Sequence, residues 1–249
     1  VMALQGKLRD TFAISERFVL DGFESFSRSQ YYPNHINLLV GSETEFIYGM
    51  GFAQLRRKGR MSATQKELRG ILEEKYGKAP PKAVELSVAD LLGDLCKLLT
   101  DKGIEETTLI TDEHKAYPRA LKRLKEEGKR FTHERYSSKA PRTTSSPLFP
   151  VNYTDRQLRK DMANHVRETL QFARCPAAMM TRNTLYQMYH NYFSPRRVRE
   201  QRAGNWSTRA FELGLSREVF MSALASVWKR RVFLKKYDLW NCERQTWLL

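Results

Sequence analysis

The sequence has few cysteines and no long apolar run. Its three cysteines, Cys96, Cys175 and Cys242, are far apart and form no C-x-x-C pair, which argues against a structural zinc site and a disulfide framework. No apolar stretch approaches the roughly 20 residues that span a bilayer, and the first residues lack the layout of a secretory signal. We therefore expect a folded protein of the cytoplasm with no membrane partner.

Acidic residues are scarce relative to basic ones. The 249 residues include 28 Asp and Glu against 43 Lys and Arg, which gives a formal net charge of +15 at pH 7. Such an excess favours a polyanionic partner through counterion release, and nucleic acid is a better candidate than a membrane surface. With 41% hydrophobic residues, the chain can bury a sizeable core, either as one large domain or as a domain with an appendage.

Five stretches have the composition and alternation of β-strands. They are residues 18–23, 35–40, 46–52, 107–112 and 129–134. Short links between the first three predict an antiparallel meander. Asp21 lies within the first strand, on the same side as Val19 and Phe23, so its carboxylate should face inward. Asp112 ends the fourth strand, and ligand chemistry collects at the carboxyl ends of strands in open α/β sheets.

Helix starts are predicted from capping residues. Ser62 with Gln65 forms a capping box that opens a helix ending near residue 77. Ser87 is expected to cap a helix with a leucine-rich core stripe. Thr154 with Gln157 forms a second capping box, which predicts a helix from residue 155 to about residue 174. Pro176 should open the next helix.

Asp155 would lie in the first turn of the helix that Thr154 opens. At about 100° per residue, its carboxylate shares a face with Leu158 and Met162. An acid on an apolar face is costly unless a cation meets it. Asp161 and Glu168, by the same count, lie well away from that face and are the alternatives to Asp155.

Asp21, Asp112 and Asp155 together form a candidate site. Convergent carboxylates without a cysteine or histidine cluster make a hard oxygen site, which suits Mg²⁺ or Mn²⁺. Two such ions can activate a water or a 3′-hydroxyl and stabilise the leaving oxygen of a phosphodiester. The positive charge of the chain is consistent with a nucleic-acid substrate.

Basic residues near these acids are candidates for DNA contact. They are Arg56, Arg57, Lys58 and Arg60 in one loop, His114 and Lys115 after Asp112, Arg156 and Arg159 beside Asp155, and Arg196 and Arg197 beyond an aromatic segment. A solvated face, a structural histidine or ordinary salt bridges are the alternatives for these positions. Four tryptophans in the tail, Trp206, Trp228, Trp240 and Trp247, suggest docking onto the body or onto a partner chain.

Several segments resemble the DDE-type transposases of bacterial insertion sequences, here with three aspartates. They are Leu20-Asp21-Gly22-Phe23, Thr111-Asp112-Glu113-His114-Lys115-Ala116-Tyr117-Pro118, Phe131-Thr132-His133, Asn152-x-x-Asp155-Arg156, Asn164-His165-x-Arg167-Glu168-Thr169 and Tyr189-His190-Asn191-Tyr192. The resemblance covers residues 18–197. It implies a ribonuclease H-like α/β fold, with a mixed five-stranded sheet flanked by helices and a C-terminal helical extension.

The resemblance also implies an organisation and an activity. We expect a lead-in helix in residues 1–16, the catalytic core in residues 17–175, and a basic helical region containing the tryptophans in residues 176–249. Asp21, Asp112 and Asp155 would be the metal-binding triad of a DNA transposase with two Mg²⁺ or Mn²⁺ ions. Its partner would be double-stranded DNA, and it would work as a homodimer or higher oligomer at the nucleoid of a bacterium or archaeon.

Other functions remain open on the sequence. The same fold could stop at hydrolysis, as a nuclease or a resolvase of branched DNA, or the chain could be a non-catalytic DNA-binding derivative. Such transposases usually carry an N-terminal domain that binds DNA ends, and about 16 residues precede the first strand here. End recognition would then lie in a missing domain, in the basic C-terminal region or in a partner.

Overall fold

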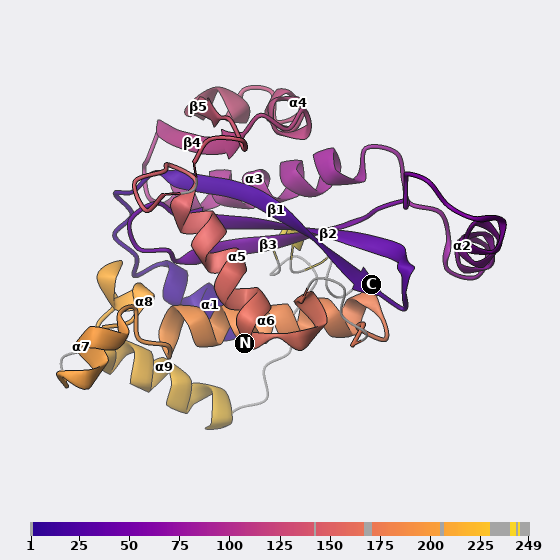
Figure 1. The fold of residues 1–249 in the computed structure, drawn as a ribbon. Helices are drawn as coiled ribbons and strands as arrows, with labels where there is room; N and C mark the ends of the chain where they lie inside the picture. Colours follow the sequence, from indigo (N-terminus) through magenta and orange to yellow (C-terminus); the bar gives the residue numbers. More distant parts are fainter. Residues whose placement is uncertain are drawn as a thin grey trace.

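The computed structural model describes residues 2–141, 143–166, 171–204, 207–229, 240–242 and 244. Its centre is a five-stranded mixed sheet in the order β3-β2-β1-β4-β5 (Figure 1). The strands are β1 (Phe18–Ser27), β2 (Ser29–Gly41), β3 (Ile47–Gln54), β4 (Thr107–Asp112) and β5 (Phe131–Tyr136). All five predicted strands are present, and β1 and β2 are longer than expected.

The directions of the strands divide the sheet into two parts. β1, β2 and β3 form the predicted antiparallel meander. β4 pairs in parallel with β1 on one side and with β5 on the other. This mixed α/β arrangement is compatible with the ribonuclease H-like fold that the sequence predicted.

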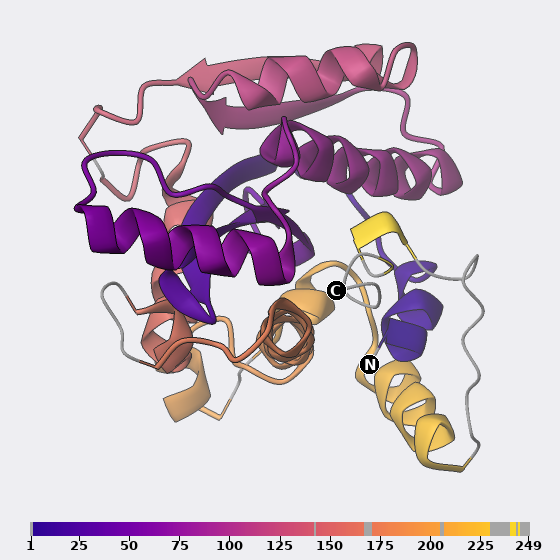
Figure 2. The same ribbon diagram turned by 90° about the vertical axis from the view of Figure 1, so that its right-hand side faces the viewer.

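Helices cover both faces of the sheet (Figures 1 and 2). Alternate residues of β1 explain this, because Phe18 and Leu20 belong to one buried cluster whereas Val19 and Phe23 belong to another. The first cluster packs against α3 (Ala83–Asp101) and α4 (Ala116–Arg123), and the second against α5 (Phe149–Asp161). The predicted leucine stripe of α3 is core, as expected.

Helix α6 (Pro176–Tyr192) binds the edge strand β3 through side-chain amides. Asn191 Oδ1 accepts from Ile47 N at 2.9 Å, and the Nδ2 of Asn191 and the Nε2 of Gln187 both donate to Ile47 O at 2.9 Å. These bonds pair the backbone N–H and C=O of Ile47, at the start of the edge strand, which would otherwise lack a partner strand. The first helix of the C-terminal region is thus packed on the sheet.

The remaining helices lie outside the two main layers. α1 (Met2–Arg9) contacts α9 (Arg217–Lys229), and α7 (Val198–Arg202) and α8 (Arg209–Glu212) precede α9. Short 3₁₀ turns span Glu127–Arg130 and Ala163–His165. α2 (Ala63–Tyr76) projects from the body as an arm at the side opposite α7 (Figure 1).

Of the three predicted helix caps, one is correct. Ser62 and Gln65 form both bonds of a capping box at the start of α2. Ser87 lies inside α3, where its hydroxyl accepts from Asn37 Nδ2 at 3.0 Å, across to β2. Thr154 lies inside α5, where its hydroxyl donates to Pro150 O at 2.8 Å. Both hydroxyl groups make buried hydrogen bonds from inside a helix, so neither residue caps a helix start.

The helix that contains Asp155 therefore differs from the predicted one at both ends. It begins at Phe149 and ends at Asp161, and it is followed by the Ala163–His165 turn. Of the tail tryptophans, Trp240 lies under the guanidinium of Arg9, 3.3 Å from the ring centroid, so it docks onto the body. Trp206, Trp247 and the Trp228 side chain lie outside the described residues.

A buried carboxylate stabilises the turn between β2 and β3 through hydrogen bonds. Glu16 is 5% exposed. Its oxygens accept from Glu43 N and Thr44 N, both at 2.9 Å, from the Thr44 hydroxyl at 2.7 Å and from the Tyr48 hydroxyl at 2.8 Å. Four donors around one carboxylate offset the cost of its burial.

We expect Glu16→Ala to lower the free energy of unfolding by about 3 kcal/mol, because it leaves several buried donors without an acceptor. Urea unfolding followed by circular dichroism measures the change. Glu43→Ala is the matched control, since the Glu43 side chain is exposed and its substitution should change stability by less than about 0.5 kcal/mol. Equal effects of the two substitutions would contradict this role of Glu16.

Candidate functional site

Asp21 and Asp112 are neighbours on adjacent strands. β1 and β4 run parallel with Leu20 opposite Thr111, and the two aspartates follow directly after this pair. Side chains in register on parallel strands point to the same face. Since Asp112 is the last residue of β4, the two carboxylates lie together where that strand ends.

Asp21 is held by two donors in a largely buried setting. Its Oδ1 accepts from Gly22 N at 2.7 Å and from the Tyr117 hydroxyl at 3.2 Å. The pKa of Asp21 is raised to about 6, chiefly by burial. The carboxylates of Asp112 and Asp155 add to the rise, and the two hydrogen bonds oppose it. Asp21 therefore experiences the negative charge of both other acids.

Tyr117 comes from α4 and is only 1% exposed. Its burial and the nearby Asp21 and Asp112 hold its pKa well above the ordinary value, so the phenol stays protonated and donates to Asp21. Sequence reasoning assigned no role to Tyr117, although it lies in the Asp112 segment. Only the packing of α4 against the end of β4 shows the contact.

The turn after Asp112 is fixed by that residue itself. Asp112 Oδ1 accepts from His114 N at 2.8 Å, which is the local bond of an Asx turn. The ring of His114 packs edge-on against Tyr117, with the centroids 5.7 Å apart. The turn leads directly into α4 and so links Asp112 to the donor of Asp21.

Asp155 does not lie on the fully buried face of α5. Val151, Thr154 and Leu158 are buried, whereas the Asp155 side chain is 30% exposed. The expected cation is present within the same helix, because Arg159 Nε lies 2.9 Å from Asp155 Oδ1 and 3.2 Å from Oδ2. The pairing is the i,i+4 kind that stabilises helices.

Arg159 is itself fixed by several contacts. Its Nη1 donates to His165 O at 2.9 Å, and its guanidinium carbon lies 4.8 Å from the centroid of the Phe23 ring. His165 is buried in turn, with Ser25 Oγ 2.8 Å from its Nδ1 and Asn183 Oδ1 2.7 Å from its Nε2. This network ties the end of α5 to β1 and α6, and burial lowers the pKa of His165 to about 4, so His165 is neutral at pH 7.

Of the two alternatives to Asp155 as the third acid, the structure describes only Asp161. Asp161 is the last residue of α5, and its Oδ2 accepts from the Tyr186 hydroxyl at 3.1 Å. The charges of Asp112 and Asp155 are among the main causes that raise the pKa of Asp21. Glu168 lies outside the described residues.

The three aspartates supply only oxygen donors. Burial is the main cause of the raised pKa of Asp21, and repulsion by the other two carboxylates adds to it; a divalent cation would relieve that repulsion. This donor set fits Mg²⁺ or Mn²⁺. Within the described ranges, no three His, Cys, Asp or Glu side chains are already gathered as a metal site. Asp155 is turned toward Arg159 instead.

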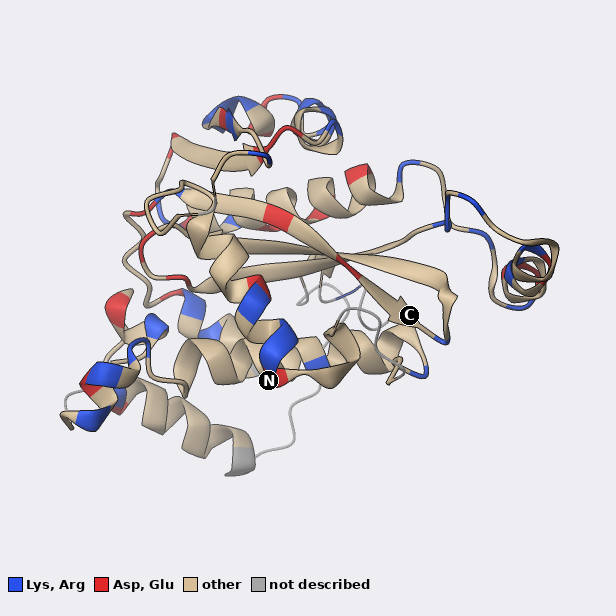
Figure 3. Cartoon of the chain, in the orientation of Figure 1, with Lys and Arg blue, Asp and Glu red and all other residues tan. Residues whose placement is uncertain are grey.

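The predicted DNA-contact residues form two groups. Arg56, Arg57, Lys58, His114 and Lys115 line one cleft. Arg196 and Arg197 lie at the other end of the molecule, near α7, where they pair with Glu212 and Glu200. Figure 3 shows this distribution, with Lys and Arg along the stretch leading to α2, around α4 and near α7.

Of the three remaining candidates, two are exposed and one is engaged in a salt bridge, as is Arg56 of the cleft group. Arg60 and Arg156 are exposed. Arg56 makes two bonds to Glu73, at 2.7 and 3.1 Å, and Arg159 is paired as described. The alternative of salt bridging thus describes Arg56 and Arg159, whereas Arg60 and Arg156 have the exposure that a phosphate contact needs.

A scan against models of known protein families found no match, and a search of curated proteins found none. Among the described residues, no helix has the length and apolarity to cross a membrane. Cys96, Cys175 and Cys242 form no disulfide in the described part of the chain.

We expect Asp21→Asn to stabilise the metal-free protein by about 2 to 3 kcal/mol at pH 7.5. The pKa of Asp21 is about 6 in the folded state against 3.8 for the free group, so the folded protein binds the proton more tightly. Wild-type stability from this group is therefore lost as the pH rises from about 4 to 6, and asparagine does not undergo that loss.

Urea unfolding in EDTA at pH 4 and pH 7.5 measures the difference, which should appear only at the higher pH. Asp101→Asn, at an exposed site on α3, is the control and should show no such dependence on pH. A stability gain at pH 4 equal to that at pH 7.5 would contradict a raised pKa at Asp21.

Proposed function

We propose that this protein is a metal-dependent DNA transposase that cuts transposon ends and joins the 3′-hydroxyl ends to target DNA. The observation that supports the proposal best is the side-by-side position of Asp21 and Asp112 on parallel β1 and β4, with the charge of Asp155 acting on Asp21. The resemblance of the surrounding segments to DDE-type transposases supports the same assignment.

Asp21, Asp112 and Asp155 are the residues that would hold two Mg²⁺ or Mn²⁺ ions. When bound, such ions activate the attacking hydroxyl and stabilise the leaving oxygen. The other residues of the site hold the three carboxylates in position, and one of them, Tyr117, keeps its proton to do so. Tyr117 orients the Asp21 carboxylate by donating to Oδ1, and the Asx turn fixes Asp112. Arg159 offsets the charge of Asp155 and anchors it to the His165 network.

The charge of the chain supports DNA as the partner. The net charge is +15, and Lys and Arg are present along the stretch leading to α2, around α4 and near α7 (Figure 3). Because two transposon ends must be held together, we include a homodimer or higher oligomer in the proposal, acting at the nucleoid. If sedimentation gave a monomer both with and without DNA, only the oligomeric part of the proposal would be contradicted.

We expect Asp21→Asn, Asp112→Asn and Asp155→Asn each to reduce DNA cleavage and strand joining by at least 100-fold, since each removes a carboxylate from the proposed site. The substrate is a supercoiled plasmid that carries the genomic DNA flanking the coding region on both sides. Nicked, linear and joined products are separated on gels in Mg²⁺, in Mn²⁺ and in EDTA, and EDTA should abolish all of them.

Asp161→Asn is the matched control and should retain activity within about threefold. If Asp155→Asn retained activity and Asp161→Asn lost it, the assignment of the third acid would be wrong. Nicks without joined strands would favour a nuclease or resolvase. DNA binding without cleavage in any divalent ion would favour a non-catalytic derivative.

A further inference from the structure

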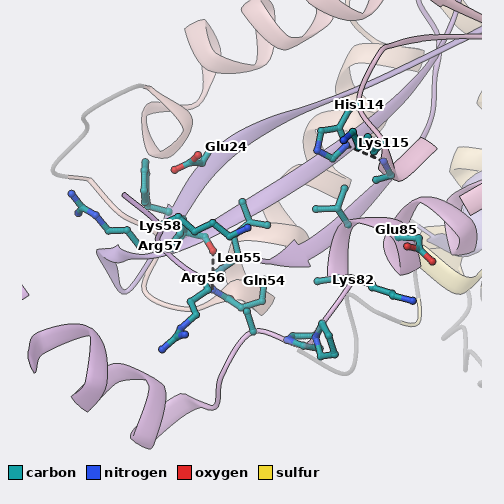
Figure 4. Close-up of a pocket in the computed structure, with 18 of the residues that line it drawn as sticks. Glu24, Gln54, Leu55, Arg56, Arg57, Lys58, Lys82, Glu85, His114 and Lys115 are labelled. Atoms are coloured by element: carbon teal, nitrogen blue, oxygen red, sulfur yellow. Dashed lines mark hydrogen bonds between the residues drawn. The ribbon is translucent and has the colours of Figure 1, made fainter. Parts of the chain in front are cut away.

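A cleft of about 1220 Å³ lies on the α3 side of the sheet. Three separate stretches wall it, namely residues 54–58 before α2, residues 79–85 at the start of α3, and residues 114–119 at the start of α4. Figure 4 shows the first stretch facing His114 and Lys115 across the cleft. Glu24 and Phe26 of β1 contribute to the remaining wall.

The cleft is strongly cationic. Six basic side chains line it, from all three stretches: Arg56, Arg57, Lys58, Lys82, Lys115 and Arg119. The lining acids are Glu24 and Glu85. Glu85 is already paired with Arg123, so its charge is offset from outside the cleft. The balance favours an anionic ligand with several charges.

Aromatic rings accompany these cations. Phe26 and Phe172 line the cleft and pack edge-on, with centroids 6.2 Å apart. Both are only partly buried. Cations along a groove together with accessible aromatic faces are the features that bind unpaired nucleotides, because each base can stack on a ring while phosphates meet the cations.

The size and location of the cleft also favour a single strand. Its volume is only slightly above the roughly 300–1,000 Å³ of small-molecule sites, so it suits a few nucleotides rather than a duplex. It adjoins the acids, because His114 lines it and also donates its N–H to Asp112. Asp21 lies on the same strand, β1, as the lining residues Glu24 and Phe26.

We propose that this cleft binds a short unpaired segment of DNA that leads away from the reacting phosphodiester. The segment stacks on Phe26 and Phe172 and places its phosphates against Lys58, Lys115 and Arg119. The inference rests on the proposed function for its choice of DNA, and it adds that the strand next to the cut is separated from its complement. A duplex end is therefore opened when it enters the site.

The test is fluorescence anisotropy of a labelled eight-nucleotide thymidine strand with the full-length protein in EDTA. We expect unlabelled single strand to compete at least tenfold better than a duplex of the same length. Lys58→Glu with Arg119→Glu should weaken binding at least tenfold. Arg199→Glu with Arg202→Glu, which makes the same change of charge on α7, should weaken it less than twofold. Circular dichroism confirms that both double variants are folded.

Phe172→Ala separates nucleotide binding from simple anion binding. It should weaken the single strand about fivefold or more, and it should leave competition by inorganic polyphosphate unchanged. Equal competition by duplex and single strand, or equal effects of the two charge reversals, would overturn the proposal. An unchanged affinity of Phe172→Ala would overturn it as well.

Failure of the cleft proposal can be distinguished from failure of the transposase proposal. Asp21→Asn and Asp112→Asn should bind the single strand in EDTA at least as tightly as wild type, because neither residue lines the cleft and each substitution removes a negative charge that repels phosphate. Preferred single-strand binding by a protein that cleaves no DNA would reject the transposase assignment and keep the cleft. Cleavage without a preference for the single strand would reject the cleft assignment and keep the enzyme.

Discussion

The parallel pairing of β1 with β4 is the constraint on which the rest of the site depends. It sets Leu20 opposite Thr111 and therefore brings Asp21 beside Asp112, although 90 residues separate them in sequence. Burial of Asp21 raises the pKa of its carboxyl group, and repulsion from the neighbouring Asp112 carboxylate adds to the rise, to a pKa of about 6. The end of β4 also places Tyr117 where its hydroxyl can donate to Asp21.

The third acid is organised by a second set of contacts. Asp155 is paired with Arg159, and Arg159 is held through His165 O to a buried network of Ser25, His165 and Asn183. The position of Asp155 thus depends on side chains from β1 and α6 as well as on α5. A metal site formed with Asp155 would draw on a carboxylate whose present partner is a cation of the same helix, so ion binding and this salt bridge compete for the same oxygens.

Sequence patterns predicted the elements better than they predicted their ends. The five strands were found because alternation and β-branched residues depend on local chain geometry. Capping rules were correct at Ser62, where the helix start is exposed, and wrong at Ser87 and Thr154. Those hydroxyls bond to Asn37 and to Pro150 O inside the fold, and nothing in the local sequence distinguishes such a partner from a capped amide. The same error moved the expected start of the helix from Phe149 to residue 155. Asp155 looked buried because the apolar face was counted over a helix that reached residue 174, whereas α5 ends at Asp161.

The sequence by itself determined the five strands, the antiparallel meander of the first three, the inward position of Asp21, the place of Asp112 at the end of a strand, and the excess of positive charge, because each follows from residue type and short-range periodicity. The mixed sheet was implied by the resemblance to a known family. The tertiary structure decided which acids adjoin each other, that Tyr117 donates a hydrogen bond to Asp21, and that Arg159 forms a salt bridge with Asp155. It also decided that basic residues from three separate stretches line one cleft. These are contacts between residues distant in the chain or between side chains on a shared surface. They depend on the register of parallel strands and on helix packing, which no local pattern records.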